Sequence, residues 1–378
     1  MNFTTRAIHD GQDPEEMTGA VNVPVFLTST YAQEAVGKVK FADYARGDNP
    51  TRAALEAVLA SLEEAQFAVA FSSGLSAVDA VIRTLTPGDR VLMSTDAYGG
   101  TYRMLTRIFG TWGIHTDVVD ISDIDVVKSS WREGTALVWV ETPSNPFLRI
   151  VDIKGVAALA HQHGAKLVVD NTFATPYLQT PLSLGADVVV HSTTKYLGGH
   201  SDVIGGAVVT NDADVAQKVK FLQYAVGAIP GPLDCYLVIR GIRTLGLRMD
   251  RHQENAAKVV EMLSTHPGID RVWYPGLPAH PNHEIAKSQM SGFGGMVSVE
   301  LAGGASEARR FAEATRIFTL AESLGGVESL IEVPALMTHL STSGSLLEVP
   351  DNLVRLSVGI EDGDDLLADL QAALANES

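Results

Sequence analysis

The stretch Asp187-Val-Val-Val-His-Ser-Thr-Thr-Lys195-Tyr-Leu-Gly-Gly-His-Ser-Asp-Val-Ile-Gly-Gly206 decides the fold of this chain. Its apolar start, Asp187–Val190, is short and continuous, which is typical of a strand buried on both faces of a sheet. Small hydroxyl residues and glycines follow, and Lys195 stands among them. A lysine held there is drawn away from solvent, which lowers its pKa and favours the neutral amine that Schiff-base chemistry requires. A lysine that merely reaches the surface is the alternative interpretation.

The same order of strand, polar turn and helix recurs along the chain. Short apolar strands are predicted at Phe67–Phe71, Arg90–Ser94, Ala136–Val140, Lys166–Val169 and Ala207–Val209. Helical patterns alternate with them, so the sequence predicts an α/β fold whose mostly parallel sheet is covered by helices on both faces. Ligands bind beyond the carboxyl ends of the strands in such sheets, and polar residues follow the predicted strands there.

The chain is expected to divide into three parts. Residues 1–46 carry turn signals without sustained periodicity and predict an irregular arm that lies on the body or on a neighbouring subunit. Residues 47–240 hold the predicted sheet and open with a helix, for which Asn49 is the cap and Pro50 the first residue. Residues 241–378 predict a smaller α+β domain with helices at Arg251–Leu263 and Asp364–Leu374 and strands at Gly294–Leu301 and Val354–Val358.

Composition and charge exclude several classes of protein. The 378 residues include 28 Lys and Arg against 45 Asp and Glu, a net charge of −17, and 46% are hydrophobic. This balance argues against a disordered chain and against nucleic acid or anionic lipid as a partner. The single cysteine, Cys235, excludes an intrachain disulfide, and no metal site is predicted. No apolar run is long enough for a membrane span and no signal segment is recognisable, so a cytoplasmic location is expected.

Four features at predicted strand ends suit one cofactor. Lys195 could carry an aldehyde as a Schiff base, and Asp170, at the end of the preceding strand, could pair with a protonated pyridine nitrogen. Gly74 and Leu75 open a helix whose backbone N–H groups could bind a phosphate, and Tyr98 could stack on an aromatic ring. Together they predict pyridoxal phosphate. A helix cap, a tight turn and a core tyrosine are the alternative interpretations of Asp170, Gly74 and Tyr98.

Over nearly its whole length the chain resembles the Cys/Met-metabolism family of pyridoxal-phosphate enzymes, most closely the cystathionine γ-lyases and γ-synthases. Besides the opening stretch, four motifs carry the resemblance: Tyr44-Ala-Arg-Gly-Asp-Asn-Pro-Thr51, Phe71-Ser-Ser-Gly74, Val168-Val-Asp-Asn-Thr-Phe173 and Glu322-Ser-Leu-Gly-Gly326. The resemblance implies the PLP-dependent transferase fold of type I. A large cofactor domain with a mixed, mostly parallel sheet would precede a smaller C-terminal domain, and pyridoxal 5'-phosphate would be the cofactor.

The resemblance also implies roles for individual residues. Lys195 would hold the cofactor and act as the catalytic base, and Tyr98 would stack on its ring and assist in proton transfer. The remaining cofactor-binding residues would be Asp170, Thr172, Gly74, Leu75, Ser192 and Thr194, with Tyr44 and Arg46 reaching the phosphate from a neighbouring subunit. Arg355 would bind the substrate α-carboxylate, helped by Asn145 and Ser323. Shared sites of this kind imply a homotetramer built as a dimer of dimers.

Four residues bear on the choice of reaction. Asp43 and Glu332 match acidic residues that lie near the distal amino group of cystathionine in the γ-synthase and γ-lyase branch, and Arg103 matches a substrate residue of that branch. No cysteine follows Tyr98 closely, which counts against a methionine γ-lyase. Leu324 stands where cystathionine β-lyases tend to carry tryptophan, which weakens the β-lyase interpretation.

The favoured prediction is γ-elimination of L-cystathionine to cysteine, 2-oxobutyrate and ammonia. The alternative is a cystathionine γ-synthase, which joins cysteine to O-succinyl- or O-acetyl-homoserine, followed by an O-acylhomoserine sulfhydrylase and a methionine γ-lyase. Both leading reactions use the same residues, so the sequence separates them poorly. A non-catalytic protein on the same fold would be expected to lose Lys195, Asp170 or Arg355, and all three are present.

Overall fold

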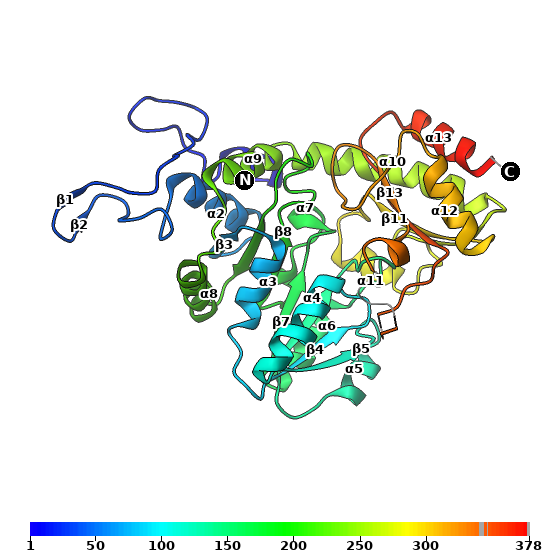
Figure 1. The fold of residues 1–378 in the computed structure, drawn as a ribbon, viewed down its shortest axis with the longest axis horizontal. Helices are drawn as coiled ribbons and strands as arrows, with labels where there is room; N and C mark the ends of the chain where they lie inside the picture. The colour runs from blue at the N-terminus through cyan, green and yellow to red at the C-terminus, as the bar shows by residue number, and fades with distance from the viewer. Residues whose placement is uncertain (340–343, 346, 376–378) are drawn as a thin grey trace.

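Two sheets and a projecting arm organise the chain (Figure 1). The structure, a computed structural model, describes residues 1–339, 344–345 and 347–375. The seven-stranded sheet uses residues between 67 and 210, and the five-stranded sheet uses residues between 269 and 357. We keep the three-part division as a proposal, and note that its second boundary, after residue 240, falls inside helix α9 (Pro232–Ile242).

The seven-stranded sheet is mixed and mostly parallel, as predicted. Its strands are β3 (Phe67–Phe71), β4 (Arg90–Ser94), β5 (His115–Val119), β6 (Thr135–Glu141), β7 (Lys166–Asp170), β8 (Val188–Ser192) and β9 (Gly206–Thr210). They lie in the order β3-β9-β8-β7-β6-β4-β5, and β9 runs antiparallel to both of its neighbours. Strand β5 was not predicted, because it is an exposed to half-buried edge strand rather than a continuous apolar run.

Helices cover both faces of this sheet, and strand β6 shows how. Leu137 and Trp139 pack in the same core as helices α3 and α8, whereas Val138 and Val140 pack on the other face with α5 and α6. Successive side chains of a strand point to opposite faces, so an apolar run is the pattern of a strand covered on both sides. The helices of this part are α2 (Pro50–Leu62), α3 (Gly74–Ile82), α4 (Gly99–Arg103), α5 (Ile124–Ser130), α6 (Ile153–Gln162), α7 (Thr175–Leu178) and α8 (Ala213–Val226), with shorter turns η1 (Met104–Ile108), η2 (Phe109–Trp112) and η3 (Pro181–Leu184).

The N-terminal arm is less irregular than predicted. It begins with a helix, α1 (Phe3–His9), and carries a small hairpin of β1 (Gln33–Ala35) and β2 (Lys38–Val39) that projects from the body in Figure 1. Helix α1 is too short for a sequence period to reveal, and it is held by packing of Ala7 in the core beside α2. Helix α2 begins as predicted, since the Asn49 side chain accepts from the backbone N–H of Thr51 at 2.9 Å and Pro50 follows the cap.

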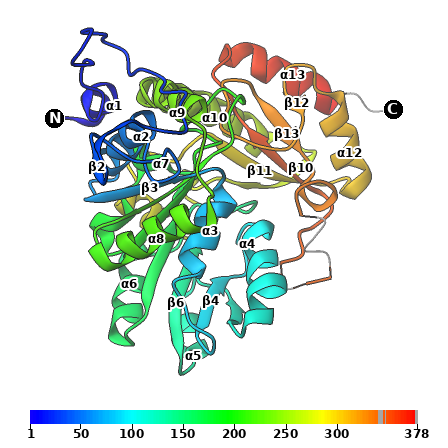
Figure 2. The ribbon, with the colours of Figure 1, turned by 60° about the vertical axis from the view of Figure 1, so that its left-hand side comes forward.

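The smaller sheet has the order β10-β11-β14-β13-β12 and lies beside the large sheet in Figure 2. Its strands are β10 (Ile269–Trp273), β11 (Met296–Leu301), β12 (Thr319–Leu320), β13 (Leu330–Glu332) and β14 (Leu353–Ser357). Its helices are α10 (Leu245–Thr265), α11 (His283–Gln289), α12 (Gly304–Ala314) and α13 (Gly363–Ala375), with one turn, η4 (Pro334–Leu336). The prediction missed β10, β12 and β13, because two of them have at most three residues and β10 combines exposed, half-buried and buried residues without a continuous apolar run.

Candidate active site

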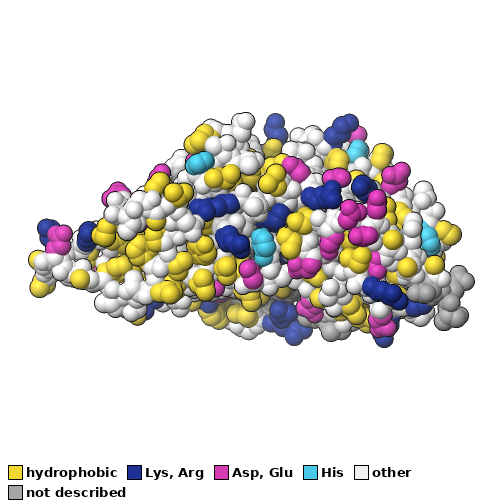
Figure 3. Space-filling view, turned by 90° about the horizontal axis from the view of Figure 1, so that it is seen from above, with side chains coloured by type: hydrophobic (Ala, Val, Ile, Leu, Met, Phe, Trp, Pro, Cys, Tyr) yellow, Lys and Arg dark blue, Asp and Glu magenta, His cyan; other side chains and the backbone are white. Residues whose placement is uncertain are grey.

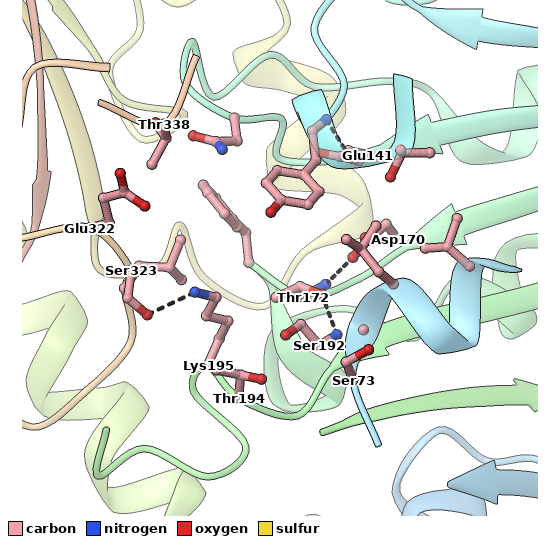
Figure 4. Close-up of a pocket in the computed structure, with 18 of the residues that line it drawn as sticks. Ser73, Glu141, Asp170, Thr172, Ser192, Thr194, Lys195, Glu322, Ser323 and Thr338 are labelled. Atoms are coloured by element: carbon pink, nitrogen blue, oxygen red, sulfur yellow. Dashed lines mark hydrogen bonds between the residues drawn. The ribbon is translucent and has the colours of Figure 1, made fainter. Parts of the chain in front are cut away.

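A cavity of about 300 Å³ opens at the carboxyl ends of the strands of the large sheet. Its walls come from both parts of the chain, since the ends of β6, β7 and β8 contribute Glu141, Asp170 and Ser192 (Figure 4) and β14 contributes Arg355. The predicted site residues among its lining are Gly74, Leu75, Tyr98, Asn145, Asp170, Thr172, Ser192, Thr194, Lys195, Ser323 and Arg355. The sheet topology thus brings together residues that are almost 300 positions apart in the sequence.

Lys195 stands in the turn after β8 and points toward the other wall. Its Nζ donates to Ser323 Oγ at 2.7 Å, and Figure 4 shows the two side chains reaching toward each other. Burial, aided by the positive charge of Arg355, lowers the pKa of Lys195 to about 8. The amine is therefore available in its neutral, nucleophilic form near neutral pH, as the strand-end position predicted.

Asp170, Thr172 and Ser192 form a chain of hydrogen bonds on the floor of the cavity. The Thr172 backbone N–H donates to Asp170 Oδ1 at 3.0 Å, and the Ser192 backbone N–H donates to Thr172 Oγ1 at 2.9 Å. Burial raises the pKa of Asp170, which the Thr172 hydrogen bonds oppose. Among the described residues, no lysine or arginine forms an ion pair with Asp170, so its carboxylate is set to receive a cation from the cavity.

The start of α3 forms a cradle beside that floor. Ser73 caps the helix by accepting from the Ser76 backbone N–H, which leaves the N–H groups of Gly74 and Leu75 at the cavity. A Cβ on Gly74 would lie 3.0 Å from the Cβ of Ser192, so the close approach of these two segments favours glycine. The hydroxyls of Ser192 and Thr194 complete a set of donors that suits a phosphate.

Tyr98 and Arg355 face the cavity from opposite sides. The Tyr98 backbone N–H donates to Glu141 Oε1 at 2.6 Å, which holds the tyrosine at the wall. Arg355 is 3% exposed, donating from Nη1 to Asn145 Oδ1 at 2.7 Å and from Nη2 to the Ser323 carbonyl at 2.8 Å. Its guanidinium is thereby oriented for a second planar partner, such as a carboxylate.

Five predicted residues lie outside the cavity lining. Asp43, Tyr44 and Arg46 are exposed on the arm, where the Arg46 guanidinium lies 5.3 Å from the Tyr44 ring centroid. Arg103 is exposed on α4. Glu332 lies behind the wall, 1% exposed, and its Oε1 is 3.1 Å from Arg355 Nη1. Glu332 is thus a buried partner of the arginine, and its carboxylate is not offered to the cavity.

Two acidic residues of the lining were missed as site residues. Glu322 is exposed at the substrate-side wall, beside Ser323 in the motif that the sequence already singled out. Glu141 ends strand β6, as Asp170 ends β7, and this position was the signal that could have revealed it. Thr338 also lines the cavity and donates to Glu332 Oε1 at 2.9 Å. Nothing in the sequence around Thr338 indicates that this residue lines the cavity.

The fold and this site define a pyridoxal-phosphate enzyme. The family described as Cys/Met metabolism PLP-dependent enzyme matches residues 4–375, and the chain belongs to that family. The cofactor of this family is pyridoxal phosphate, and its enzymes act in the metabolism of cysteine and methionine. Across the described residues, no helix is both long and apolar enough to cross a membrane.

Relatives with three different activities match the chain over almost its full length. Cystathionine gamma-synthase of Mycobacterium tuberculosis is 58% identical, covering 98% of this chain and 96% of its own. Cystathionine beta-lyase of Lactococcus lactis is 51% identical, covering 99% of both, and cystathionine gamma-lyase of Dictyostelium discoideum is 49% identical, covering 98% and 97%. The crystal structure of metB from Corynebacterium glutamicum is 52% identical with a TM-score of 0.99, covering 100% of this chain and 98% of that one.

The residues present fit the cofactor on structural grounds alone. The cavity holds an aldehyde-reactive amine at Lys195, a carboxylate at Asp170 that no described lysine or arginine pairs with, and a donor cradle in which Gly74 packs closely on Ser192. When bound, pyridoxal phosphate supplies an electron sink for negative charge that develops on the substrate carbons. Lys195 would hold it, Asp170 would pair with its ring nitrogen, and the start of α3 would bind its phosphate.

Proposed function

We propose that this chain is a cystathionine γ-synthase, which replaces the acyloxy group of an O-acylhomoserine with the thiol sulfur of cysteine. The observation that carries the proposal is 58% identity to the mycobacterial γ-synthases over 98% of the chain. The sequence alone favoured the γ-lyase slightly, and the relatives shift the preference to the synthase. The Cγ–O bond breaks and the carboxylate leaves, while the Cγ–S bond forms and the thiol proton is released.

The geometry supports chemistry at a carbon remote from the α-amino group. Arg355 and Asn145 would bind the substrate α-carboxylate, and Lys195 Nζ, held by Ser323, would remove the α-proton and deliver it to a neighbouring position. Tyr98 would close the other face of the cavity and exclude water. Each role uses a side chain that is already held by a hydrogen bond in the structure or placed at the cavity wall.

A negatively charged side chain at the cavity, Glu322, supports a substrate or product with two amino groups. Glu322 lines the cavity and is exposed, so its carboxylate can meet the distal ammonium of cysteine or cystathionine. This is the role that the sequence assigned to Glu332, whose carboxylate is used by Arg355 instead. Asp43 and Arg103 stay proposed substrate residues, although neither lines the cavity within one chain.

A product assay tests the proposed function. Purified enzyme is incubated with L-cysteine and either O-succinyl- or O-acetyl-L-homoserine, and separately with L-cystathionine alone. Cystathionine formation that greatly exceeds keto-acid release from cystathionine supports the synthase, and the preferred acyl donor is identified in the same assay. Rapid 2-oxobutyrate release without cystathionine synthesis would overturn the proposal in favour of the γ-lyase.

The γ-lyase is the second candidate, and one observation favours it. Arg355, Lys195 and Glu322 would serve a cystathionine γ-lyase equally well. The relative from Dictyostelium discoideum with that name is 49% identical. In that reaction the Cγ–S bond breaks, cysteine leaves, and water completes the release of 2-oxobutyrate and ammonia. Pyruvate in the same assay would instead indicate β-elimination.

The arm supports a proposal about assembly. Leu27, Val36 and Phe41 are exposed, and Figure 3 shows hydrophobic side chains gathered over the half of the molecule toward the arm. We propose a cytoplasmic homotetramer in which Tyr44 and Arg46 complete the phosphate site of a neighbouring copy. Mixed tetramers of Lys195→Ala and Arg46→Ala subunits should then recover activity that neither variant has alone. Monomeric protein in sedimentation would contradict this proposal.

A further inference from the structure

Glu141 is an acidic residue of the cavity for which the mechanism above has no use. It ends strand β6 and lies in register with Asp170 at the end of the parallel strand β7. Both residues line the cavity, and Figure 4 shows them at the same end of it. Glu141 is only 6% exposed, so its carboxyl group cannot rely on water for solvation.

Within the described part of the chain, neither of the two neighbouring carboxyl groups has an ion-pair partner. Glu141 accepts a hydrogen bond from the Tyr98 backbone N–H at 2.6 Å, and none of the ion pairs between described residues involves Glu141 or Asp170. Two basic side chains of the surroundings form contacts with other acidic residues. Arg149 pairs with Asp120 at 2.7 Å and approaches Asp96 at 3.9 Å, and the His191 ring contacts Glu63 at 2.5 Å.

Charge balance then favours different protonation states for the two carboxyl groups. A cofactor with one pyridinium nitrogen supplies one positive charge, which compensates one carboxylate and not two. Asp170 is the better anion, because Thr172 donates to it and His191 lies near enough to favour its charge. Glu141 has one donor and a further acidic neighbour, Asp96, and burial together with Asp170 raises the pKa of Glu141 well above its ordinary value.

We propose that Glu141 works as a neutral carboxylic acid, a positioning residue that holds the main chain of Tyr98 and leaves Asp170 as the only anion at this end of the cavity. The inference rests on the pyridoxal-phosphate family of the chain and not on which cystathionine reaction it catalyses. An ionised Glu141 would place a second buried negative charge beside Asp170 with nothing to compensate it.

Three substitutions separate the neutral role from an anionic one. Glu141→Gln keeps the size of the residue and the acceptor for the Tyr98 N–H, so the cofactor dissociation constant and kcat/KM should stay within about threefold of wild type. Glu141→Ala removes the acceptor and should weaken cofactor binding about tenfold. Glu141→Asp keeps an acid but shortens it, and should resemble the alanine variant. Glu300→Gln, in the small sheet, is the matched control and should change neither quantity.

Infrared spectroscopy of the holoenzyme provides the second readout. The wild-type enzyme at neutral pH should show the carbonyl-stretch band of a protonated carboxylic acid, and the band should be lost in Glu141→Gln but kept in Glu300→Gln. A wild-type spectrum without such a band overturns the proposal even if no variant folds. The proposal also fails if Glu141→Asp keeps cofactor affinity while Glu141→Gln loses it, since that result assigns the role to the negative charge.

Discussion

The two walls of the cavity differ in how directly the sequence specifies them. The cofactor wall is made of strand ends, where Asp170, Ser192 and Lys195 follow apolar runs of the parallel sheet. The substrate wall is made by the smaller sheet, where strand β14 contributes Arg355 and the loop between β12 and β13 contributes Ser323 and Glu322. The predicted strand-end residues of the first wall line the cavity, whereas Glu332, an acidic residue predicted for the second wall, does not.

Strand register explains why Glu322 lines the cavity and Glu332 does not. Glu332 lies opposite Arg355 in the antiparallel pair of strands β13 and β14. Its carboxylate therefore contacts the arginine and is not part of the cavity lining. Glu322 stands ten positions earlier, in a loop where Ser323 adopts a φ of 94°, and it faces the cavity. In a parallel sheet, the topology alone brings the strand ends to one edge. In an antiparallel pair, the direction in which a charged side chain points depends on the register of the two strands.

The largest expected effect is on the cofactor wall. Lys195→Ala removes both the amine that would hold the cofactor and the proposed base, so turnover should fall by a factor on the order of 10³ or more. Lys287→Ala, which changes an exposed lysine on α11, is the control and should leave the rate unchanged. The measurement is the steady-state rate together with the visible absorbance of the cofactor. A Lys195→Ala enzyme with substantial activity would refute the assignment of the cofactor wall.

The second prediction tests the substrate wall at Arg355. Arg355→Ala should raise KM for α-amino acid substrates by roughly 10²-fold, because it removes a buried, hydrogen-bonded charge. It should also lower the free energy of unfolding by about 3–5 kcal/mol, since Glu332 is left buried without its partner. Denaturant unfolding measures this loss.

A double variant separates the two effects of that substitution. Adding Glu332→Gln to Arg355→Ala removes the orphaned charge and should recover much of the stability without restoring KM. Recovery of KM in the double variant would show that Arg355 is not the carboxylate clamp.

The third prediction concerns pH and returns to the cofactor wall. With a Lys195 pKa of about 8, the neutral fraction of the amine falls about tenfold per pH unit below 8, and the rate at which cofactor-free protein recombines with pyridoxal phosphate should fall with it. Because the ordinary value is 10.5, the unfolded chain binds more protons between those two values, and stability of the cofactor-free protein should rise with pH there. Recombination with a midpoint near pH 10 would contradict the burial of this amine.

The smallest expected effect distinguishes the two acidic residues of the substrate wall. Glu322→Gln should raise KM for cystathionine about tenfold and leave KM for an O-acylhomoserine, which lacks the distal amino group, nearly unchanged. Glu332→Gln should affect both substrates alike, because Glu332 acts through Arg355. Equal effects of the two substitutions on cystathionine alone would restore the role that the sequence assigned to Glu332.

Most of the fold could be predicted because its signals are local. Strand β4 has the predicted bounds, Arg90–Ser94, and Asn49 caps α2, since both depend on neighbours within a few residues. Strand β5 and the short strands β12 and β13 could not be predicted, because their pairing partners rather than their own residues stabilise them. Helix α1 belongs to the same group, since it is held by packing against α2.

The sequence by itself determined the class of protein: apolar strands with polar ends require a parallel sheet, and the motif around Lys195 requires a pyridoxal-phosphate site at its edge. Only the tertiary structure decided where the charged side chains lie around that site. It paired Glu332 with Arg355, turned Glu322 toward the cavity and set Glu141 beside Asp170. The physical reason is that a buried charge is governed by what lies within a few ångströms in space, and those neighbours come from distant parts of the chain.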